Sequence, residues 1–223
     1  MKRIDLLLGA GAATLAGVSL GAADQPLPNL GKPIAKPAKG NVKVAVMISP
    51  MATVIDFAGP WETFQDAGYD TYVVSKTLDV VEATNGLKVM PDYTFETAPQ
   101  PNVVVVGAQH APDEAYPWLR KVAQGTDVLM SVCTGAFVVA RAGLLDGQNA
   151  TTHHLFYDKF AAAFPKVHLV RGPRYVENRD ISCAGGLTSG IDLALRVVER
   201  YDGAKSADDV AFYMEHARTS RPQ

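Results

Sequence analysis

The sequence has few of the residues that would indicate a disulfide framework, a nucleic-acid partner or a metal site. Two cysteines, Cys133 and Cys183, in 223 residues are too few for a disulfide scaffold. Lysine and arginine together number 21 against 23 acidic residues, and no basic stripe is present, so nucleic acid is not an expected partner. The cysteines and the five histidines follow no metal-ligand spacing, and we therefore expect no metal and no other cofactor.

A long run without charge does occur, near the start of the chain. Two basic residues precede residues 6–23, eighteen residues that carry no charge and end in three small residues before Asp24. This order is typical of a secretory signal peptide, so we expect residues 1–23 to be cleaved and the mature protein to be exported to the periplasm, without membrane attachment. An uncleaved anchor is the alternative, although many glycines and alanines make the run a weak membrane span.

The remaining chain divides into a proline-rich linker, residues 24–41, and one domain, residues 42–223. Four prolines and scattered lysines predict that the linker is extended and mobile. In the domain, apolar runs of strand length alternate with helical patterns. This alternation predicts an α/β fold with a doubly wound, mostly parallel sheet and helices on both faces.

The expected elements follow from the same patterns. Strands are expected at residues 42–48, 71–75, 103–106, 128–132, 150–152 and 167–170, and hairpins at 80–84 with 87–90 and at 175–177 with 181–183. Helices are expected from Pro60, as a first helical position, to Gly68, and at residues 113–124, 135–145, 155–164, 191–201 and 207–217.

Residues 127–147 carry the strongest chemical signal. A strand pattern ends at Val132 and a helical pattern begins at Gly135, so Cys133 lies at the joint. Small residues around it, Ser131 and Gly135, allow the sharp turn of a nucleophile elbow, with sulfur in place of a hydroxyl. A thiol at a helix N-terminus is favoured as the thiolate. A buried, inert cysteine is the alternative, but the position at the joint favours a reactive one.

Ligands of doubly wound sheets bind at the carboxyl ends of the strands. That rule brings together three loops: the turn after Val106, the elbow at Cys133, and the loop after the first strand, which carries Asp56. We therefore expect the chemistry of the protein at this edge of the sheet.

Four motifs, in order, resemble the ThiJ/PfpI superfamily, whose fold is flavodoxin-like and class I glutamine amidotransferase-like. They are residues 56–64 (DFAGPWETF), 131–140 (SVCTGAFVVA), 142–154 (AGLLDGQNATTHH) and 185–195 (GGLTSGIDLAL). The resemblance covers nearly all of residues 42–204. It is closest to the isonitrile hydratases and to the amidotransferase-like domain of certain AraC-type regulators.

The resemblance implies a role for each matching residue. Cys133 matches the nucleophile, and Asp56 matches the acidic residue that touches its sulfur in isonitrile hydratases. Thr134 matches the threonine whose N–H and hydroxyl can hold an anion. Gly107 matches the glycine whose loop amides complete an oxyanion hole, and His153 matches a histidine that lines the pocket in relatives of the parkinsonism-associated deglycase.

The sequence departs from the superfamily pattern at two places. Thr134 follows the cysteine where the peptidase-like and glyoxalase-like branches have a histidine, so their Cys-His pair is absent. Val106, Gly107 and Ala108 replace the usual Pro-Gly-Gly, which keeps the loop amides, including that of Ala108, but changes the loop's composition.

Structural alternatives remain for several of these residues. Asp56 could cap the helix before Pro60, although a carboxyl among apolar neighbours also suits a thiol partner. His153 and His154 are adjacent and would face opposite ways on a strand, so only one of them would reach the site. Cys183 is expected to be an inert core thiol, and a disulfide between the two cysteines would silence the nucleophile.

These observations favour an exported, cysteine-dependent hydratase or hydrolase of a small carbon–nitrogen or carbonyl substrate, similar to isonitrile hydratase. The alternative is a non-catalytic ligand-binding or cysteine redox-sensing domain of the same superfamily. Glutamine amidotransfer is a weak third, because the histidine and glutamate it needs have no convincing counterpart. The expected partners are a small-molecule substrate and, because relatives are commonly dimers, a second copy of the chain.

Overall fold

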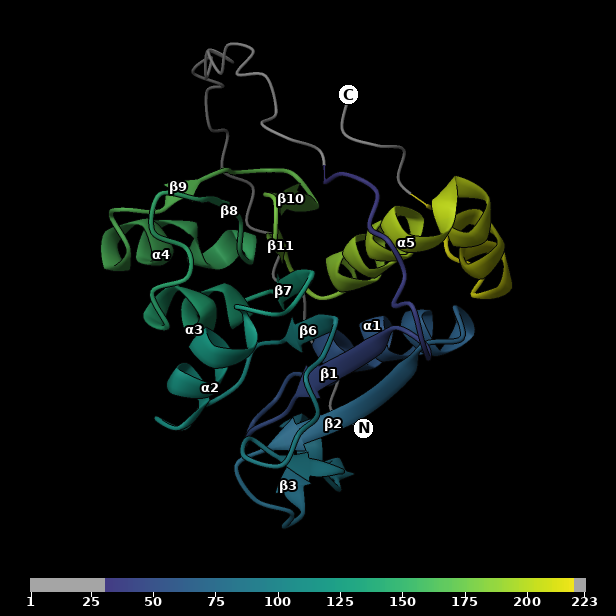
Figure 1. Ribbon diagram of the computed structural model, residues 1–223. Coiled ribbons are helices and arrows are strands. Elements are labelled where there is room, and N and C mark those ends of the chain that lie inside the picture. Colours follow the sequence, from purple (N-terminus) through teal and green to yellow (C-terminus); the bar gives the residue numbers. More distant parts are fainter. Residues whose placement is uncertain (1–30, 219–223) are drawn as a thin grey trace, which may run out of the picture.

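The computed structural model of the protein describes residues 31–218, in which a seven-stranded sheet separates two layers of helices (Figure 1). The strand order is β10-β11-β7-β6-β1-β2-β5, and every neighbouring pair is parallel except β10 with β11. The strands are β1 (Lys43–Met47), β2 (Asp70–Ser75), β5 (Tyr93–Thr94), β6 (Val103–Val106), β7 (Val128–Val132), β10 (Tyr175–Glu177) and β11 (Ile181–Ala184). Two short pairs lie outside this sheet: antiparallel β3 (Val81–Glu82) with β4 (Lys88–Val89), and parallel β8 (Asn149–Ala150) with β9 (His168–Leu169).

Helices cover both faces of the sheet. They are α1 (Val54–Asp66), α2 (Ala115–Val122), α3 (Gly135–Arg141), α4 (Tyr157–Ala163) and α5 (Ser189–Tyr213), with single 3₁₀ turns η1 (Thr84–Gly86) and η2 (His154–Phe156). α1 and α5 pack on one face and α2, α3 and α4 on the other. The predicted doubly wound α/β fold is confirmed.

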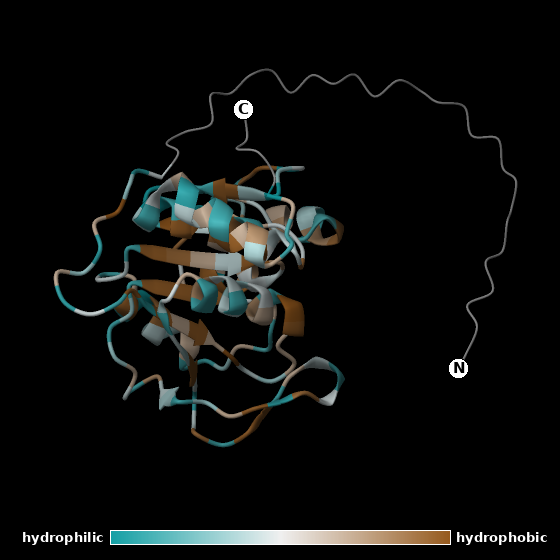
Figure 2. Ribbon diagram, turned by 90° about the vertical axis from the view of Figure 1, so that its right-hand side faces the viewer, coloured by the Kyte–Doolittle hydropathy of each residue, from teal (hydrophilic) through white to brown (hydrophobic). Residues whose placement is uncertain are grey.

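The valine run of β6 shows why the sheet is buried on both sides. Val103 and Val105 belong to the core under α1 and α5, whereas Val104 and Val106 belong to the core under α2, α3 and α4. All four are fully buried, as expected for β-branched residues in a central parallel strand. Figure 2 shows these hydrophobic strands enclosed between helices whose outer faces are hydrophilic.

The first helix differs from the prediction. α1 begins at Val54, and Pro60 lies inside it rather than at its first position. The preceding Gly59 is not a turn residue but a point of close approach, because a Cβ there would lie 2.8 Å from Cγ1 of Ile191 on α5. Since proline has no N–H, the carbonyl of Asp56, four residues earlier, loses its helical hydrogen bond.

Other boundaries shift by a few residues. The helix expected to end at Leu145 ends at Arg141, and the one expected at 155–164 divides into η2 and α4. The two helices expected at the end of the domain form α5, which is interrupted at Gly203 with a φ of 83°. Both predicted hairpins, β3–β4 and β10–β11, are confirmed.

The prediction of a mobile linker is wrong for residues 31–36, which we call the strap. Arg196 donates a hydrogen bond to the carbonyl of Gly31 (3.1 Å), and Arg200 donates one to that of Lys32 (3.1 Å). The amide of Ile34 in turn donates to the carbonyl of Arg200 (2.7 Å), and the Ile34 side chain packs on the core. Composition could not reveal this docking, because the donors come from α5, far along the sequence.

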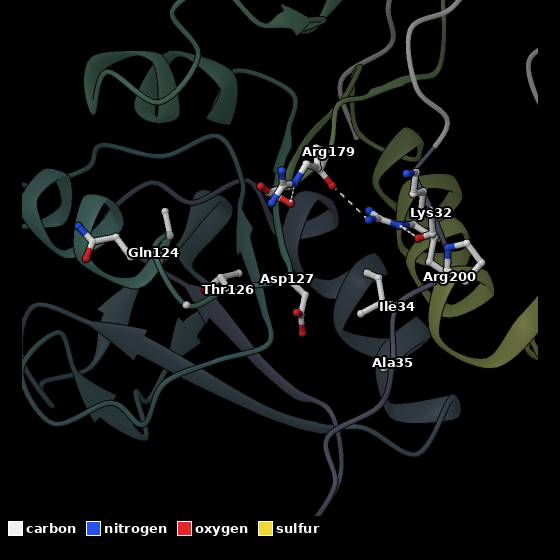
Figure 3. Close-up of a pocket in the computed structure, with 13 residues that line it drawn as sticks. Lys32, Ile34, Ala35, Gln124, Thr126, Asp127, Arg179 and Arg200 are labelled. Carbon is white, nitrogen blue, oxygen red and sulfur yellow. Dashed lines mark hydrogen bonds and ion pairs between the residues drawn. The ribbon is translucent and has the colours of Figure 1, made fainter.

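The strap borders a pocket of about 790 Å³, shown in Figure 3, where Arg200 reaches between Lys32 and Arg179. Thr126 and Asp127 of its wall directly precede β7, so the pocket lies at the amino edge of the sheet. It is therefore remote from the expected site at the carboxyl edge.

The predicted signal peptide, residues 1–23, and residues 24–30 of the predicted linker lie outside the described residues. Within residues 31–218, no helix has both the length and the apolar character needed to cross a membrane.

Candidate active site

The nucleophile elbow predicted at Cys133 is present. Cys133 connects β7 to α3 with a φ of 58°, a value that non-glycine residues rarely adopt. Its amide donates to the carbonyl of Gly185 (2.6 Å), and its carbonyl accepts a hydrogen bond from the Thr152 hydroxyl (2.8 Å). Gly135 is required at the start of α3, because a Cβ there would overlap the carbonyl oxygen of Val106. Neighbouring segments therefore hold this strained turn.

The structure brings Asp56 to the elbow, as the sequence predicted. Asp56 lies in the first turn of α1 and is fully buried. Its Oδ2 accepts a hydrogen bond from the amide of Ala108 (3.0 Å), and Gly107 allows this approach, because a Cβ there would lie 2.9 Å from that of Asp56. The carboxyl is bound by a loop from another part of the chain, so Asp56 does not act as the cap of its own helix.

The thiol of Cys133 is a close neighbour of this carboxyl. Oδ1 of Asp56 makes no hydrogen bond of ordinary length within residues 31–218, but the Cys133 thiol and the Leu187 amide lie near enough to lower the pKa of the carboxyl. The site therefore contains an acid pair, a carboxyl and a thiol, that is shielded from solvent.

Burial controls the charge of this pair. It raises the pKa of Asp56 from 3.8 to about 6, against the lowering effect of the Ala108 amide, the Cys133 thiol and the Leu187 amide. Burial, followed by the Asp56 charge, raises the pKa of the Cys133 thiol to about 11, although the amides of Thr134 and Leu187 oppose the rise. Burial and the Asp56 charge therefore oppose the thiolate that the helix start was expected to favour, and the two groups titrate as a coupled pair.

Leu187 is a site residue that the sequence did not indicate. Its backbone has a φ of 54°, and its amide faces both Cys133 and Asp56. The residue lies in the turn between β11 and α5, at the carboxyl end of the strand that neighbours β7. Gly185 and Gly186, which precede it, are typical of a turn. The donor, however, is a backbone amide, and the type of side chain at a position does not reveal how its amide is used.

The other predicted site residues have different surroundings. The amide of Thr134 faces the sulfur, and its half-buried side chain makes no capping bond to α3. The amide of Ala108 is engaged by Asp56, so this residue holds the carboxyl rather than offering a free oxyanion donor. Gly107 permits that contact.

His153 lies beside the site without joining the acid pair. Its ring packs on Gly186, where a Cβ would overlap it, and its Nδ1 accepts a hydrogen bond from the amide of Leu155 (3.3 Å). Within the described residues it makes no hydrogen bond to Cys133 or Asp56. The expectation that His153 and His154 face opposite ways is wrong, because the chain turns into η2 there and the two rings stack at 4.5 Å. Burial and His154 lower the pKa of His153, so it is neutral at pH 7.

The second cysteine is structural. Cys183 is fully buried on β11, where it pairs in register with Ser131 of β7, and both cysteines are free thiols. Among residues 31–218, no group of three or more histidine, cysteine, aspartate or glutamate side chains could hold a metal ion.

Two proteins of known name are similar to the chain in sequence. The chain is 30% identical over 185 residues to isonitrile hydratase of Pseudomonas putida, an alignment that covers 79% of each chain. It is 32% identical over 148 residues to the HTH-type transcriptional regulator CdhR of Pseudomonas aeruginosa, spanning 64% of this chain and 44% of the regulator.

Solved structures show the same fold. A ThiJ/PfpI family protein from Pseudomonas syringae superposes with a TM-score of 0.71 at 26% identity, covering 93% of this chain and 87% of that one. DJ-1beta of Drosophila melanogaster superposes with a TM-score of 0.71 at 17% identity, covering 80% of this chain and 100% of its own. The DJ-1/PfpI family model matches residues 42–200, and the chain therefore belongs to the DJ-1/PfpI family.

Proposed function

We propose that the protein is a cysteine-dependent hydratase or hydrolase of a small carbon–nitrogen or carbonyl substrate, and that it hydrates isonitriles to N-substituted formamides. The observation that carries this proposal is the buried pair of Cys133 and Asp56, to which the amides of Thr134 and Leu187 point. The identity to isonitrile hydratase supports the choice of substrate.

The reaction needs one nucleophile and one group that moves a proton. Sγ of Cys133 attacks the terminal carbon of the isonitrile while the thiol proton passes to Asp56. Asp56 returns that proton to the same carbon, which gives a thioimidate on the sulfur. Asp56 then takes a proton from water as the water oxygen bonds to the carbon, and the nitrogen receives this proton. Cleavage of the carbon–sulfur bond, with loss of the hydroxyl proton to the sulfur, releases the formamide.

The site suits these steps because Asp56 has a pKa of about 6, close to neutral, where a group both accepts and returns protons efficiently. The Cys133 sulfur lies near two backbone donors, the amides of Thr134 and Leu187, which would also be close to negative charge on the carbon that bonds to it. Removing one such donor typically costs about 2.7–4 kcal/mol of transition-state stabilisation.

The direct test is an assay of the purified protein with simple alkyl and aryl isonitriles, following the formamide by mass spectrometry. We expect one formamide for each isonitrile consumed. If no member of the panel gives a formamide while carbonyl or nitrile substrates are hydrolysed, the isonitrile assignment fails and the broader class remains.

A redox sensor is the second candidate, because an oxidised Cys133 could hydrogen-bond to Asp56 and to the same amides. Mass spectrometry of Cys133 after mild peroxide treatment separates the two functions: rapid conversion to sulfinic acid without hydratase activity would favour the sensor.

We also propose that the protein is exported and acts as a homodimer. The charge-free run before Asp24 supports export, and a mature N-terminus at Asp24 is the expected result of N-terminal sequencing.

Exposed apolar side chains concentrated in residues 78–90 support a dimer: Leu78, Val80, Leu87 and Met90 are each 45–73% exposed. A monomeric mass in light scattering would contradict it.

A further inference from the structure

The turn at residues 185–188 presents a donor to the site but is poorly anchored by its own side chains. Leu187 has a left-handed backbone (φ 54°), which is unfavourable for a residue with a Cβ, and its side chain is 41% exposed. Thr188 is exposed as well. Because a strained main-chain conformation persists only where its surroundings determine it, other residues must hold this turn in place.

Arg174 contacts the turn at both ends. Its carbonyl accepts a hydrogen bond from the amide of Gly185 (2.8 Å), and its Nη2 donates to the hydroxyl of Thr188 (3.2 Å). Its Nε donates to Oδ2 of Asp192 in the first turn of α5 (2.5 Å). A single arginine therefore joins the end of β11, the start of α5 and the turn between them.

Asp192 fixes the guanidinium of Arg174. Its side chain is 2% exposed, and its second oxygen, Oδ1, lies 3.1 Å from Nε2 of His216 in the segment after α5. A carboxylate in the first turn of a helix is also favoured by the helix dipole. Arg174, which is 40% exposed, would otherwise be free to sample several rotamers.

We propose that Arg174 and Asp192 are positioning residues for the reaction, which act by holding the 185–188 turn so that the amide of Leu187 points at Cys133 and Asp56. The inference rests on the proposed role of Cys133 as the nucleophile. It does not depend on which substrate that nucleophile attacks.

The test replaces Arg174 by methionine, which keeps an unbranched apolar stem and removes the guanidinium donors. The rate of Cys133 alkylation by iodoacetamide, located by mass spectrometry, is followed across the pH range in which the thiol ionises. Because the Leu187 amide favours the thiolate, its displacement should move the midpoint of this profile to higher pH, and each unit of movement slows alkylation below the midpoint about tenfold. In turnover, kcat should fall on the order of tenfold with a smaller change in KM, and Arg174→Lys should recover part of both losses.

The control residue is Arg196 of α5, whose partner Glu177 is the last residue of β10. Arg196 pairs with Glu177 (3.0 Å), just as Arg174 pairs with Asp192, but Arg196 touches the strap rather than the 185–188 turn. Arg196→Met should lower the melting temperature without moving the alkylation midpoint. An unmoved midpoint in Arg174→Met, or an equal movement in Arg196→Met, would overturn the proposal.

Two further outcomes separate folding and substrate from positioning. If Arg174→Met does not fold, Thr188→Val removes only the bond from Arg174 Nη2 to an exposed hydroxyl, and it should move the midpoint in the same direction by less. A wild-type protein that makes no formamide would refute the proposed reaction, yet the alkylation profiles would still decide whether Arg174 positions the turn.

Discussion

Replacing Cys133 by alanine is expected to reduce turnover by at least about 10⁴-fold, because no other group at the site can form the bond to the substrate carbon. Stability should change little. The change removes one sulfur atom from a side chain that is already small, which costs about 1 kcal/mol. The elbow itself is held by hydrogen bonds of the Cys133 main chain, to the Gly185 carbonyl and from the Thr152 hydroxyl, which alanine retains. Formamide production and thermal unfolding of the same preparation measure both effects.

Cys183→Ala is the matched control for this prediction. Cys183 is also buried, and burial raises the pKa of its thiol to about 11, as in Cys133. It lies within β11 instead of at the elbow, and Asp56 is not among the groups that influence its pKa. This variant should therefore keep its turnover and lose some stability. Full activity of Cys133→Ala would end the role of that residue as the nucleophile.

The parts of the site that could be predicted from the sequence are those encoded in short stretches. The four valines of β6 show a strand covered on both faces, and the small residues around Cys133 show a sharp strand-to-helix turn. The rule that ligands bind at the carboxyl ends of parallel strands then brings Asp56 to the same edge. Each of these inferences depends only on the order of strands and helices along the chain, which local sequence patterns indicate well.

The parts that could not be predicted depend on contacts between distant segments. The amide of Leu187 acts through the main chain, so the type of its side chain does not reveal it. The strap is held by Arg196 and Arg200, more than 160 residues away. Burial and the Asp56 charge raise the pKa of the Cys133 thiol, and only the fold shows how deeply the sulfur is buried and which charge lies beside it.

The strained backbone of the site depends both on local sequence and on contacts between distant segments. Cys133 and Leu187 both have positive φ, and the bond from the Cys133 amide to the carbonyl of Gly185 joins the two turns. Such conformations are stable only when packed structure determines them, and here they direct the sulfur and a backbone donor toward one carboxyl. A sequence can place the strained residues at the ends of strands, but it does not show that they face each other.

Replacing Asp56 by asparagine is expected to lower kcat/KM by about 10²–10⁴-fold, the usual contribution of a general acid–base group. Asparagine keeps an oxygen for the Ala108 amide but cannot accept the thiol proton. In the wild-type protein, activity should rise with pH as Asp56 ionises, with a midpoint at about 6. The variant should lack this step, and a step of unchanged position would assign it to another group.

The same substitution is expected to stabilise the protein at alkaline pH. The pKa of Asp56 rises from 3.8 to about 6 on folding, so the folded state holds the proton more tightly than the unfolded chain. That contribution to stability is complete below pH 3.8 and is lost as the pH rises through about 6, a loss of about 3 kcal/mol for this fully buried carboxyl.

Asparagine stays neutral at every pH, so Asp56→Asn should exceed the wild type in its free energy of unfolding at pH above about 7 by up to about 3 kcal/mol. The two proteins should converge as the pH falls below 6. Denaturant unfolding at both ends of this pH range measures the difference.

Glu177→Gln is the contrasting control. Glu177 is a buried carboxylate paired with Arg196, so removing its charge should lower stability and leave turnover intact. An Asp56→Asn protein that is less stable than the wild type in alkali would contradict this prediction. It would mean that the charged form of Asp56 stabilises the fold.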